Sequence, residues 1–181
     1  MVDGGTGTLG VGAVISALAM GASKVFATGR NKSLLDRLQT IDPKRIHAFA
    51  LGERATSEII MEATGGQGVD VVIQALGANA PAATVVDSLN ALCRGGKAVN
   101  IGGVAETLPI EPIPMMVLQK SFIGSLWFST AEGQAMAAMA DAGTLNLGVF
   151  EHERFSLETV NEGLDAVEQR TGGFTNVVVM Q

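Results

Sequence analysis

Two patterns of apolar residues alternate along the first hundred positions of the chain. Short and nearly continuous apolar runs, which are typical of buried strands, occupy residues 24–29, 45–51, 69–76 and 97–103. Between them, apolar residues recur at helical spacing over residues 10–20, 31–39, 57–64 and 83–93. Strands that alternate with helices form a parallel sheet, and continuous apolar strands indicate helices on both faces. The expected fold class is α/β, a doubly wound parallel sheet (Rossmann fold) in three α/β/α layers.

The last third of the chain continues this alternation less regularly. Strands are predicted at 121–128 and 175–180, and helices at 131–143 and 156–169. Ser129 and Glu132 form an S-x-x-E capping box just before the first of these helices. The segment 111–119 contains two prolines and is expected to make only a short apolar turn. No linker or internal repeat interrupts the chain, so we expect a single domain over 1–181.

Composition narrows the classes of function. Hydrophobic residues make up 47% of the 181 positions, which is enough for a packed core. A net charge of −6 with no run of Lys or Arg argues against a nucleic-acid partner or an anionic membrane surface. No apolar run approaches the roughly 20 residues of a membrane-spanning helix. The single cysteine, Cys93, excludes an intramolecular disulfide, so we expect a cytoplasmic protein with no membrane partner.

Three glycines near the start of the chain have the spacing of a phosphate-binding loop. Gly5, Gly7 and Gly10 make G-x-G-x-x-G, followed by a predicted helix and then a predicted strand. In such loops the first glycine permits a tight turn, the second admits a pyrophosphate, and the third lets helix and strand pack closely. The N–H groups at the helix N-terminus would then face the anion. The alternative, a glycine-rich turn without a ligand, fits the βαβ spacing less well.

Other phosphate-binding patterns do not fit this sequence. A Walker loop needs G-K-[ST], but Lys97 is followed by Ala98. The short-chain dehydrogenase pattern needs glycine where Val11 stands, and the catalytic tyrosine of that family has no counterpart because the chain contains no tyrosine. The loop therefore favours a dinucleotide of the Rossmann type.

The end of the predicted strand 24–29 bears on the choice of dinucleotide. An NAD site usually places Asp or Glu there, where it binds the 2′-hydroxyl of the ribose. This chain has Gly29, Arg30 and Asn31 instead, and Asn31 is also a suitable N-cap for the next helix. Glycine leaves room for a 2′-phosphate, and a guanidinium can hold it with paired hydrogen bonds, which favours NADP over NAD. The alternatives are that Arg30 is an exposed loop charge and that Lys32, which could assist, is a solvated helix residue.

Several segments, taken in order, resemble the medium-chain dehydrogenase/reductase superfamily, and most of all its alcohol dehydrogenase-like and quinone reductase-like members. The segments are GGTGTLGVGAV, ALAMGASKVFATGRN, GVDVVIQALG, RGGKAVNIGG and FIGSLWF. The resemblance covers nearly the whole chain but only the cofactor-binding part of such an enzyme. It implies that 1–181 is a dinucleotide-binding domain with a shortened first strand, a fragment or short product that lacks the N-terminal, barrel-like catalytic domain. The strand 175–180 would then be meant to pair with that absent domain.

The resemblance implies a cofactor role for five short stretches of the chain. The glycine loop would lie along the pyrophosphate, and the stretch after the predicted strand 24–29 would surround the adenosine ribose. The three later stretches would meet the middle of the cofactor, its nicotinamide end and its carboxamide. In chain order these residues are Gly5, Gly7, Thr8, Leu9 and Gly10, then Gly29, Arg30 and Asn31, then Ala75, Leu76 and Gly77, then Ile101, Gly102 and Gly103, and finally Ser125, Leu126 and Trp127.

The activity that the resemblance implies is hydride transfer between NADPH and a carbonyl or alcohol, as in zinc-type alcohol dehydrogenases. A zinc-free quinone or enoyl reductase is an alternative, because the residues that decide between them would lie in the absent domain. A module that binds NADP without catalysis is an alternative from another class. We assign no side chain of this chain as a general acid or base, so no catalytic residue is predicted.

No metal site is expected in this chain. Its soft ligands, Cys93, His47 and His152, are far apart in the sequence and form no zinc-binding cluster. Cys93 is expected at a helix end, His47 within a strand and His152 in a charged loop. The resemblance further implies a homodimer, in which an exposed edge strand at 121–128 pairs with its symmetry mate unless the following segment folds over that edge.

Overall fold

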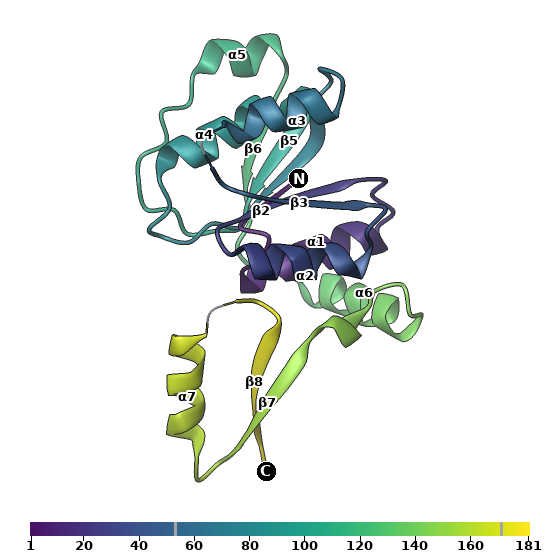
Figure 1. Cartoon of the computed structure of the whole chain (residues 1–181), viewed down its shortest axis with the longest axis vertical. Helices are drawn as coiled ribbons and strands as arrows, with labels where there is room; N and C mark the ends of the chain where they lie inside the picture. The colour runs from purple at the N-terminus through teal and green to yellow at the C-terminus, as the bar shows by residue number, and fades with distance from the viewer. Residues whose placement is uncertain (53, 171) are drawn as a thin grey trace.

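Six parallel strands form one sheet in the computed structural model, which describes residues 1–52, 54–170 and 172–181 (Figure 1). Their order across the sheet is β3-β2-β1-β4-β5-β6, and each neighbouring pair is parallel. The strand bounds are β1 Val2–Asp3, β2 Val25–Gly29, β3 Ile46–Ala50, β4 Val69–Gln74, β5 Leu92–Asn100 and β6 Ser121–Gly124. The chain therefore runs from β1 to one edge, returns to β4 and continues to the other edge. This order confirms the doubly wound α/β fold.

The helices between these strands cover both faces of the sheet (Figure 1). Their bounds are α1 Thr8–Ala19, α2 Lys32–Ile41, α3 Thr56–Ala63 and α4 Ala82–Asn90. On one face, Val11 of α1 and Leu38 of α2 belong to a buried cluster with residues of β2 and β3. On the other face, Ile60 of α3 and Leu89 of α4 belong to a second buried cluster with residues of β4 and β5. Two clusters, one on each face, give the three layers that the alternating pattern predicts.

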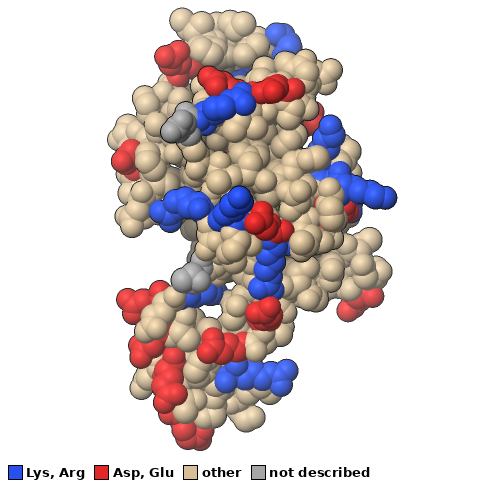
Figure 2. All heavy atoms as spheres, viewed as in Figure 1, with Lys and Arg blue, Asp and Glu red and all other residues tan. Residues whose placement is uncertain are grey.

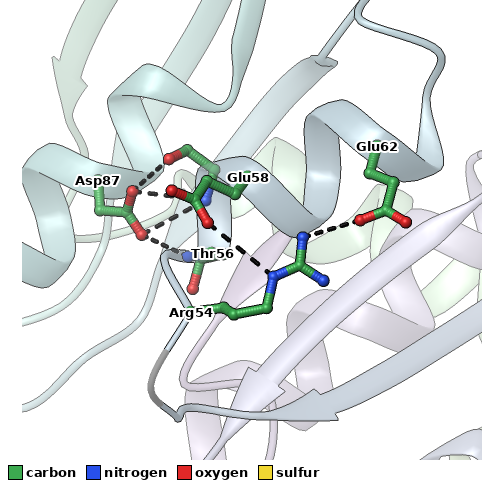
Figure 3. A network of polar contacts seen from close by, with 6 residues as sticks. Arg54, Thr56, Glu58, Glu62 and Asp87 are labelled. Atoms are coloured by element: carbon green, nitrogen blue, oxygen red, sulfur yellow. Dashed lines mark hydrogen bonds and ion pairs between the residues drawn. The ribbon is translucent and has the colours of Figure 1, made fainter.

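A carboxylate of α4 caps the neighbouring helix α3 (Figure 3). Asp87 accepts hydrogen bonds from the backbone N–H of Thr56 at 2.6 Å and of Ser57 at 3.4 Å, and also from the Ser57 hydroxyl. The first N–H groups of a helix have no intrahelical partner, so a negative charge there is stabilising. Arg54, just before α3, pairs with Glu62 near the end of that helix at 2.8 Å. Both side chains are exposed, and such an ion pair contributes little to stability.

After β6 the chain builds a smaller βαβ unit from β7, α7 and β8, which we call the C-terminal unit. The remaining elements are α5 Pro112–Val117, α6 Thr130–Asp141, a 3₁₀ helix at Leu147–Val149, β7 Glu151–Ser156, α7 Val160–Gln169 and β8 Thr175–Met180. β7 and β8 pair in parallel as a separate two-stranded sheet. Figure 1 shows this unit below the six-stranded sheet, with α7 alongside the two strands.

The structure corrects several predicted bounds. The strand predicted at 97–103 spans Leu92–Asn100, so residues 101–103 lie beyond its end. The strand predicted at 121–128 ends at Gly124, because its partner β5 ends at the paired residue, Asn100. The segment 111–119, predicted as a turn, contains the helix α5, which tolerates proline in its first turn. The helix predicted to begin at Ser156 begins at Val160, since Ser156 still pairs with Met180 in the small sheet. The capping box at the start of α6 is confirmed.

Two of the soft ligands also lie elsewhere than predicted. Cys93 lies in β5 rather than at a helix end, because α4 ends at Asn90 and Leu92 already pairs with Val69. His152 lies in β7 rather than in a loop. That strand, EHERFS, has five exposed residues out of six, so it lacks the apolar run that marks the other strands. The last strand, β8, has β7 as its partner within the chain.

Charge is distributed unevenly over the surface (Figure 2). Acidic side chains gather at the lower left, over α7, where Glu162, Asp165 and Glu168 are exposed. Within the described parts of the chain, no helix is both long enough and apolar enough to cross a membrane.

Candidate functional site

A cavity of about 460 Å³ opens at the carboxyl ends of the central strands, where the strand order reverses between β1 and β4. Doubly wound sheets bind their ligands in this crevice. Its walls come from the turns after β1, β2 and β4 and from the end of α7. The charged side chains among its described lining residues are Arg30 and Arg170, with no carboxylate, so the lining favours an anion.

The first wall is the glycine-rich turn between β1 and α1. Gly4 has a φ of +71°, a left-handed conformation that glycine adopts readily. A Cβ on Gly10 would collide with the carbonyl of Gly4, and a Cβ on Gly5 would lie 2.9 Å from the Cβ of Ala27. The absence of side chains at Gly5 and Gly10 lets the turn fold tightly and lie directly against β2. Its backbone borders the cavity at Gly7, where a phosphate could approach closely.

The N-terminus of α1 is open to the cavity. The helix begins at Thr8 with Gly7 as its N-cap, and no side chain among residues 1–52, 54–170 and 172–181 caps it. Its first hydrogen bond runs from Val11 N–H to the Gly7 carbonyl, so the N–H groups of Thr8, Leu9 and Gly10 precede it. Gly7 and Thr8 line the cavity, whereas Gly10 is buried and the Leu9 side chain is exposed outside it. The positive end of the helix dipole is therefore available to an anion.

A buried carboxyl group supports this turn. Asp3, at the end of β1, is fully buried and accepts hydrogen bonds from the Thr28 hydroxyl of β2 at 2.9 Å and from the Ser88 hydroxyl of α4. Burial raises the pKa of Asp3 to about 6, although both hydroxyl donors act in the opposite direction. Asp3 does not line the cavity. Its role is to join β1, β2 and α4 next to the glycine turn.

The second wall is the turn after β2. Gly29 and Arg30 line the cavity, and Arg30 also borders a shallower hollow with Thr6, Asn31 and Lys32. A Cβ on Gly29 would lie 2.9 Å from the Thr6 hydroxyl, so the glycine lets the first and second walls touch. The Asn31 side chain accepts a hydrogen bond from a backbone N–H in the first turn of α2, which confirms it as the N-cap.

The third wall is the turn after β4, where Ala75, Leu76 and Gly77 line the cavity. Farther along this turn, α4 begins, and its Ala82 N–H donates to the carboxylate of Glu106 at 2.8 Å. That carboxylate, which comes from the loop after β5, already occupies the N-terminus of α4. The helices α1 and α4, which both begin beside the cavity, therefore differ: Glu106 supplies an anion to α4, whereas no side chain of the described residues caps α1.

The end of β5 lies behind the third wall. The N–H groups of Ile101 and Gly102 donate to the Gln74 carbonyl at 3.0 and 2.9 Å, and that of Gly103 donates to the Leu76 carbonyl at 3.0 Å. The Gln74 side chain accepts from Leu76 N–H at 2.9 Å, and its buried Nε2 has no hydrogen-bond partner among the described residues. These residues brace the wall, and residues 101–103 do not line the cavity.

The predicted stretch after β6 does not reach the cavity. Ser125 still donates its N–H to the Asn100 carbonyl at 2.9 Å, so the stretch leaves the sheet at the same, carboxyl edge. The Leu126 and Trp127 side chains are 80% and 83% exposed and lie outside the cavity lining. Their contact with a cofactor stays a prediction.

Some of the lining residues are not among those predicted from the sequence. Gly4 directly precedes the first motif glycine and Thr6 lies between the first two, so their position in the glycine-rich segment was a usable signal. Asn79 and Thr84 follow the turn after β4, which a prediction based on short motifs does not reach. Arg170 comes from the end of α7, and no sequence motif connects it with turns so distant along the chain.

The described side chains form no group that fits a zinc ion. Cys93, His47 and His152 lie in three different strands, β5, β3 and β7. Within the described ranges, no three His, Cys, Asp or Glu side chains come together as ligands. His47 instead lies beside the Phe26 ring, with 5.4 Å between the ring centroids. That this chain binds no zinc stays a prediction.

Solved structures with this fold include two dehydrogenases. The alcohol dehydrogenase of Aeropyrum pernix matches with a TM-score of 0.77 and 24% identity, over 99% of this chain and 49% of its own. A "putative zinc-binding dehydrogenase" of Sinorhizobium meliloti, solved with NADP bound, matches with a TM-score of 0.73 and 22% identity, over 99% of this chain and 51% of its own. At these identities the likeness shows the shared Rossmann fold.

Sequence comparison shows the family. A protein of Rhizobium meliloti named "Putative D-xylulose reductase" is 34% identical over 114 residues, which are 63% of this chain and 30% of that protein. The chain thus spans less than a third of the length of this relative. The model of the family described as "Zinc-binding dehydrogenase" matches residues 8–142. That match includes α1, the strands β2 to β6 and most of the cavity walls, so the chain belongs to the zinc-binding dehydrogenase family and corresponds to its cofactor-binding part.

Proposed function

We propose that the chain binds a nicotinamide dinucleotide in the cavity at the carboxyl ends of β1, β2 and β4, as the cofactor-binding part of an oxidoreductase. One observation carries this proposal: two arginines and a helix N-terminus that no described side chain caps face a single cavity beside a tightly packed glycine turn. The NADP bound to the Sinorhizobium meliloti structure supports the same class of ligand here. When bound, the dinucleotide would supply the hydride chemistry.

The groups of this chain would hold and orient that ligand. The N–H groups of Thr8 and Leu9 would donate to the pyrophosphate, which the bare backbone of Gly7 admits. The turn at 75–77 would follow the middle of the dinucleotide. The stretches 101–103 and 125–127 would meet its nicotinamide end and its carboxamide. We assign no proton transfer to a side chain of this chain.

The turn after β2 favours NADP over NAD. Gly29 places no carboxylate near the 2′-position, and Arg30 and Lys32 border the adjacent hollow. We expect the chain to bind NADPH more tightly than NADH in titrations followed by nicotinamide fluorescence. Arg30→Gln should weaken NADPH binding about 10- to 100-fold, the worth of a charged hydrogen bond, and change NADH binding less than about twofold.

A matched control is Lys24→Gln, which removes an exposed positive charge just before β2, at the opposite end of that strand. Its affinity for NADPH should equal that of the wild-type chain. Equal binding of NADPH and NADH by the wild-type chain would overturn the preference for NADP but keep the dinucleotide site. Binding of neither dinucleotide would overturn both.

The reaction we propose is hydride transfer between NADPH and a carbonyl or alcohol, completed by a catalytic domain outside these 181 residues. This chain covers only 49% of the Aeropyrum pernix enzyme, which supports a division of the enzyme into a cofactor-binding part and a catalytic part. A zinc-free quinone or enoyl reductase and a non-catalytic NADP-binding module are the alternatives. We expect the chain by itself to bind NADPH without turning over aldehydes. We also expect it to be located in the cytoplasm, where the Cys93 thiol stays reduced. Turnover of a quinone by the chain alone would favour the reductase alternative.

We also propose that the chain forms a homodimer through residues 121–128. β6 is an edge strand of the six-stranded sheet, and Ile123, Trp127 and Phe128 on this stretch are 42%, 83% and 68% exposed. An edge strand with exposed apolar side chains needs a cover. Small-angle scattering should give a dimeric mass for the wild-type chain, and Ile123→Lys should shift it to the monomer. A monomeric wild-type mass would contradict the proposal.

A further inference from the structure

The third wall of the cavity is the longest continuous stretch of its described lining, because every residue of the turn 75–81 faces the cavity. We propose that Glu106, from the loop after β5, is a positioning residue for dinucleotide binding, which fastens the end of this turn and keeps the third wall in its binding conformation. The inference rests on the proposed function. It adds to that function a residue that lies outside the cavity lining.

The turn 75–81 has little support of its own. In the described backbone, one hydrogen bond lies wholly within the turn, from the Ala80 N–H to the Gly77 carbonyl at 3.0 Å. None of the seven residues ALGANAP is buried, and a Cβ on Gly77 would have nothing within 4 Å. Segments with so few packed contacts open readily. The conformation of the third wall therefore depends on what holds the turn from outside.

The start of the loop after β5 runs alongside the turn. Gly103 donates its N–H to the Leu76 carbonyl at 3.0 Å, and Ala105 donates its N–H to the Ala78 carbonyl at 3.4 Å. A Cβ on Gly102 would collide with the Leu76 carbonyl, so the two backbones lie in direct contact. Because the loop follows the turn in this way, it brings the next residue of the loop to the end of the third wall.

That next residue, Glu106, fastens the loop to the first residue of α4. Its carboxylate accepts a hydrogen bond from the Ala82 N–H at 2.8 Å. The N-cap of α4 is Pro81, which has no side-chain acceptor, and a negative charge at this end of a helix is stabilising. Helix α4 is itself fixed, because Val85 and Leu89 are buried. Glu106 thus ties an exposed loop to a rigid helix where the third wall ends.

Glu106 would act on binding by keeping the third wall closed before the ligand arrives. Without its bond to Ala82, the loop and the turn would be apart in part of the molecules. The apparent affinity then falls in proportion to the fraction that stays closed, and the worth of one helix cap limits this fall to about 3- to 30-fold. The competing explanation is that Glu106 only stabilises α4, as Asp87 stabilises α3. The test must separate these two roles.

Two ligands of different reach test the positioning role. In the proposed mode, NADPH extends along all three walls, whereas adenosine 2′-monophosphate reaches only the second wall beside Arg30. In NMR titrations of the 181-residue chain, Glu106→Ala should weaken NADPH and NADH by the same factor, about 3- to 30-fold, and leave adenosine 2′-monophosphate within about twofold. Glu106→Gln keeps an acceptor for the Ala82 N–H, so its affinity for NADPH should lie between those of Glu106→Ala and the wild-type chain.

Hydrogen exchange reports on the wall directly. In Glu106→Ala, the amides of Gly103 and Ala105, which donate to the turn, should exchange faster than in the wild-type chain, and saturating NADPH should restore their protection. A loss of stability confined to α4 would leave these two amides unchanged. Equal exchange of the two amides in variant and wild type would contradict the fastening role.

Two matched variants serve as controls. Asp87→Ala removes the cap of α3, whose first residues lie outside the cavity lining, so it should lower stability by a similar amount and bind NADPH as the wild-type chain does. Glu111→Ala removes an exposed carboxylate that caps no helix from the same loop and should change neither property.

The outcomes separate this inference from the proposed function. Unchanged NADPH affinity in Glu106→Ala, an equal loss in Asp87→Ala, or equal weakening of both ligands would overturn the positioning role alone. If the wild-type chain binds neither ligand, the proposed function fails as well.

Discussion

The six-stranded sheet and the C-terminal unit are both built from βαβ connections, but they bury very different amounts of their surface. In the first, helices on both faces enclose two clusters of fully buried side chains. In the second, one helix accompanies two strands, α7 buries only Gly163, and Leu157 and Leu164 are 55% and 63% exposed. In this molecule, the βαβ connections enclose a core where helices cover both faces of the sheet, and the unit covered on one face does not.

The C-terminal unit depends on the six-stranded part of the molecule for its buried contact. Phe174, just before β8, is inserted into the cluster of α1 and α2, so the unit is attached where it also borders the cavity. The stable part of the molecule thus supplies the phosphate-binding turn, and the weakly packed part supplies Arg170. Four changes test this comparison, beginning with the largest expected effect.

Removing the anchor should break the link between the two parts. Phe174→Ala empties a site that is 3% exposed and should destabilise the C-terminal unit by about 3–5 kcal/mol. In hydrogen exchange, amides of 151–180 should lose protection while those of β2 and β4 keep it. Phe155→Ala, at a half-buried position of β7, should have a smaller effect. Unchanged protection of 151–180 in the Phe174 variant would show that the unit has a core of its own.

Widening the glycine turn should damage the stable part instead. A Cβ at Gly10 would meet the carbonyl of Gly4, and backbone atoms yield little, so Gly10→Ala should cost about 3 kcal/mol and abolish dinucleotide binding. Gly12, two residues along α1, has nothing within 4 Å of its added Cβ. Gly12→Ala should therefore stabilise the chain by about 0.5–1 kcal/mol through helix propensity. Urea unfolding measures the change in the free energy of unfolding for both variants. Equal changes would contradict the close contact between Gly10 and the Gly4 carbonyl.

The carboxyl group of Asp3 should make the stability of the six-stranded part depend on pH. Between pH 3.8 and about 6 the folded chain keeps the proton that the unfolded chain releases, because burial raises the folded pKa. The stability that protonated Asp3 contributes is therefore complete below pH 3.8 and is lost as the pH rises through about 6. The loss should be about 2–3 kcal/mol.

The variant Asp3→Asn, which is neutral throughout, isolates this effect. Its free energy of unfolding minus that of the wild-type chain should rise by about 2–3 kcal/mol from pH 4 to pH 7 in urea titrations. Local hydrogen exchange in the C-terminal unit should not follow this change, since Asp3 bonds to β2 and α4. A difference that is constant with pH would mean that Asp3 is ionised in the folded chain.

The smallest expected effect concerns the cap between α3 and α4. Asp87→Ala removes the acceptor for Thr56 and Ser57 and should lower the free energy of unfolding by about 1 kcal/mol. Asp141→Ala, at the exposed C-terminal end of α6, removes the same charge without a cap and should be neutral. Equal results for the two variants would show that the bonds to Asp87 add nothing to the stable part.

Local patterns were sufficient for the elements that carry a strong local signal. The apolar runs of β2 and β4, the N-cap at Asn31 and the capping box at Ser129 are confirmed because each depends on residues within one turn or one strand. β7 escaped prediction because its side chains are exposed, so no apolar pattern was required of them. The end of β6 was placed too late because it depends on where another strand, β5, ends.

The residues of the candidate site can be separated in the same way, into those that local patterns predict and those that they do not. The glycine turn, Gly29 and Arg30 could be found from spacing, because a phosphate-binding turn is made of consecutive residues. Arg170 could not be found from spacing, because its place in the cavity lining depends on the packing of Phe174 and on the contact of Gly173 with the glycine turn. The distinction between the two helix N-termini also depended on a distant residue, Glu106.

The order of residues along the chain thus determined the fold class, the helices and strands with buried faces, and the turn that would hold a pyrophosphate. Each of these follows from hydrophobic period or backbone conformation over a few neighbouring residues. Only the tertiary structure decided which residues far apart share the cavity, which helix end is open to an anion, and that the C-terminal unit is attached at Phe174. Those features depend on how buried side chains pack across elements, and packing between distant segments leaves no period in the sequence.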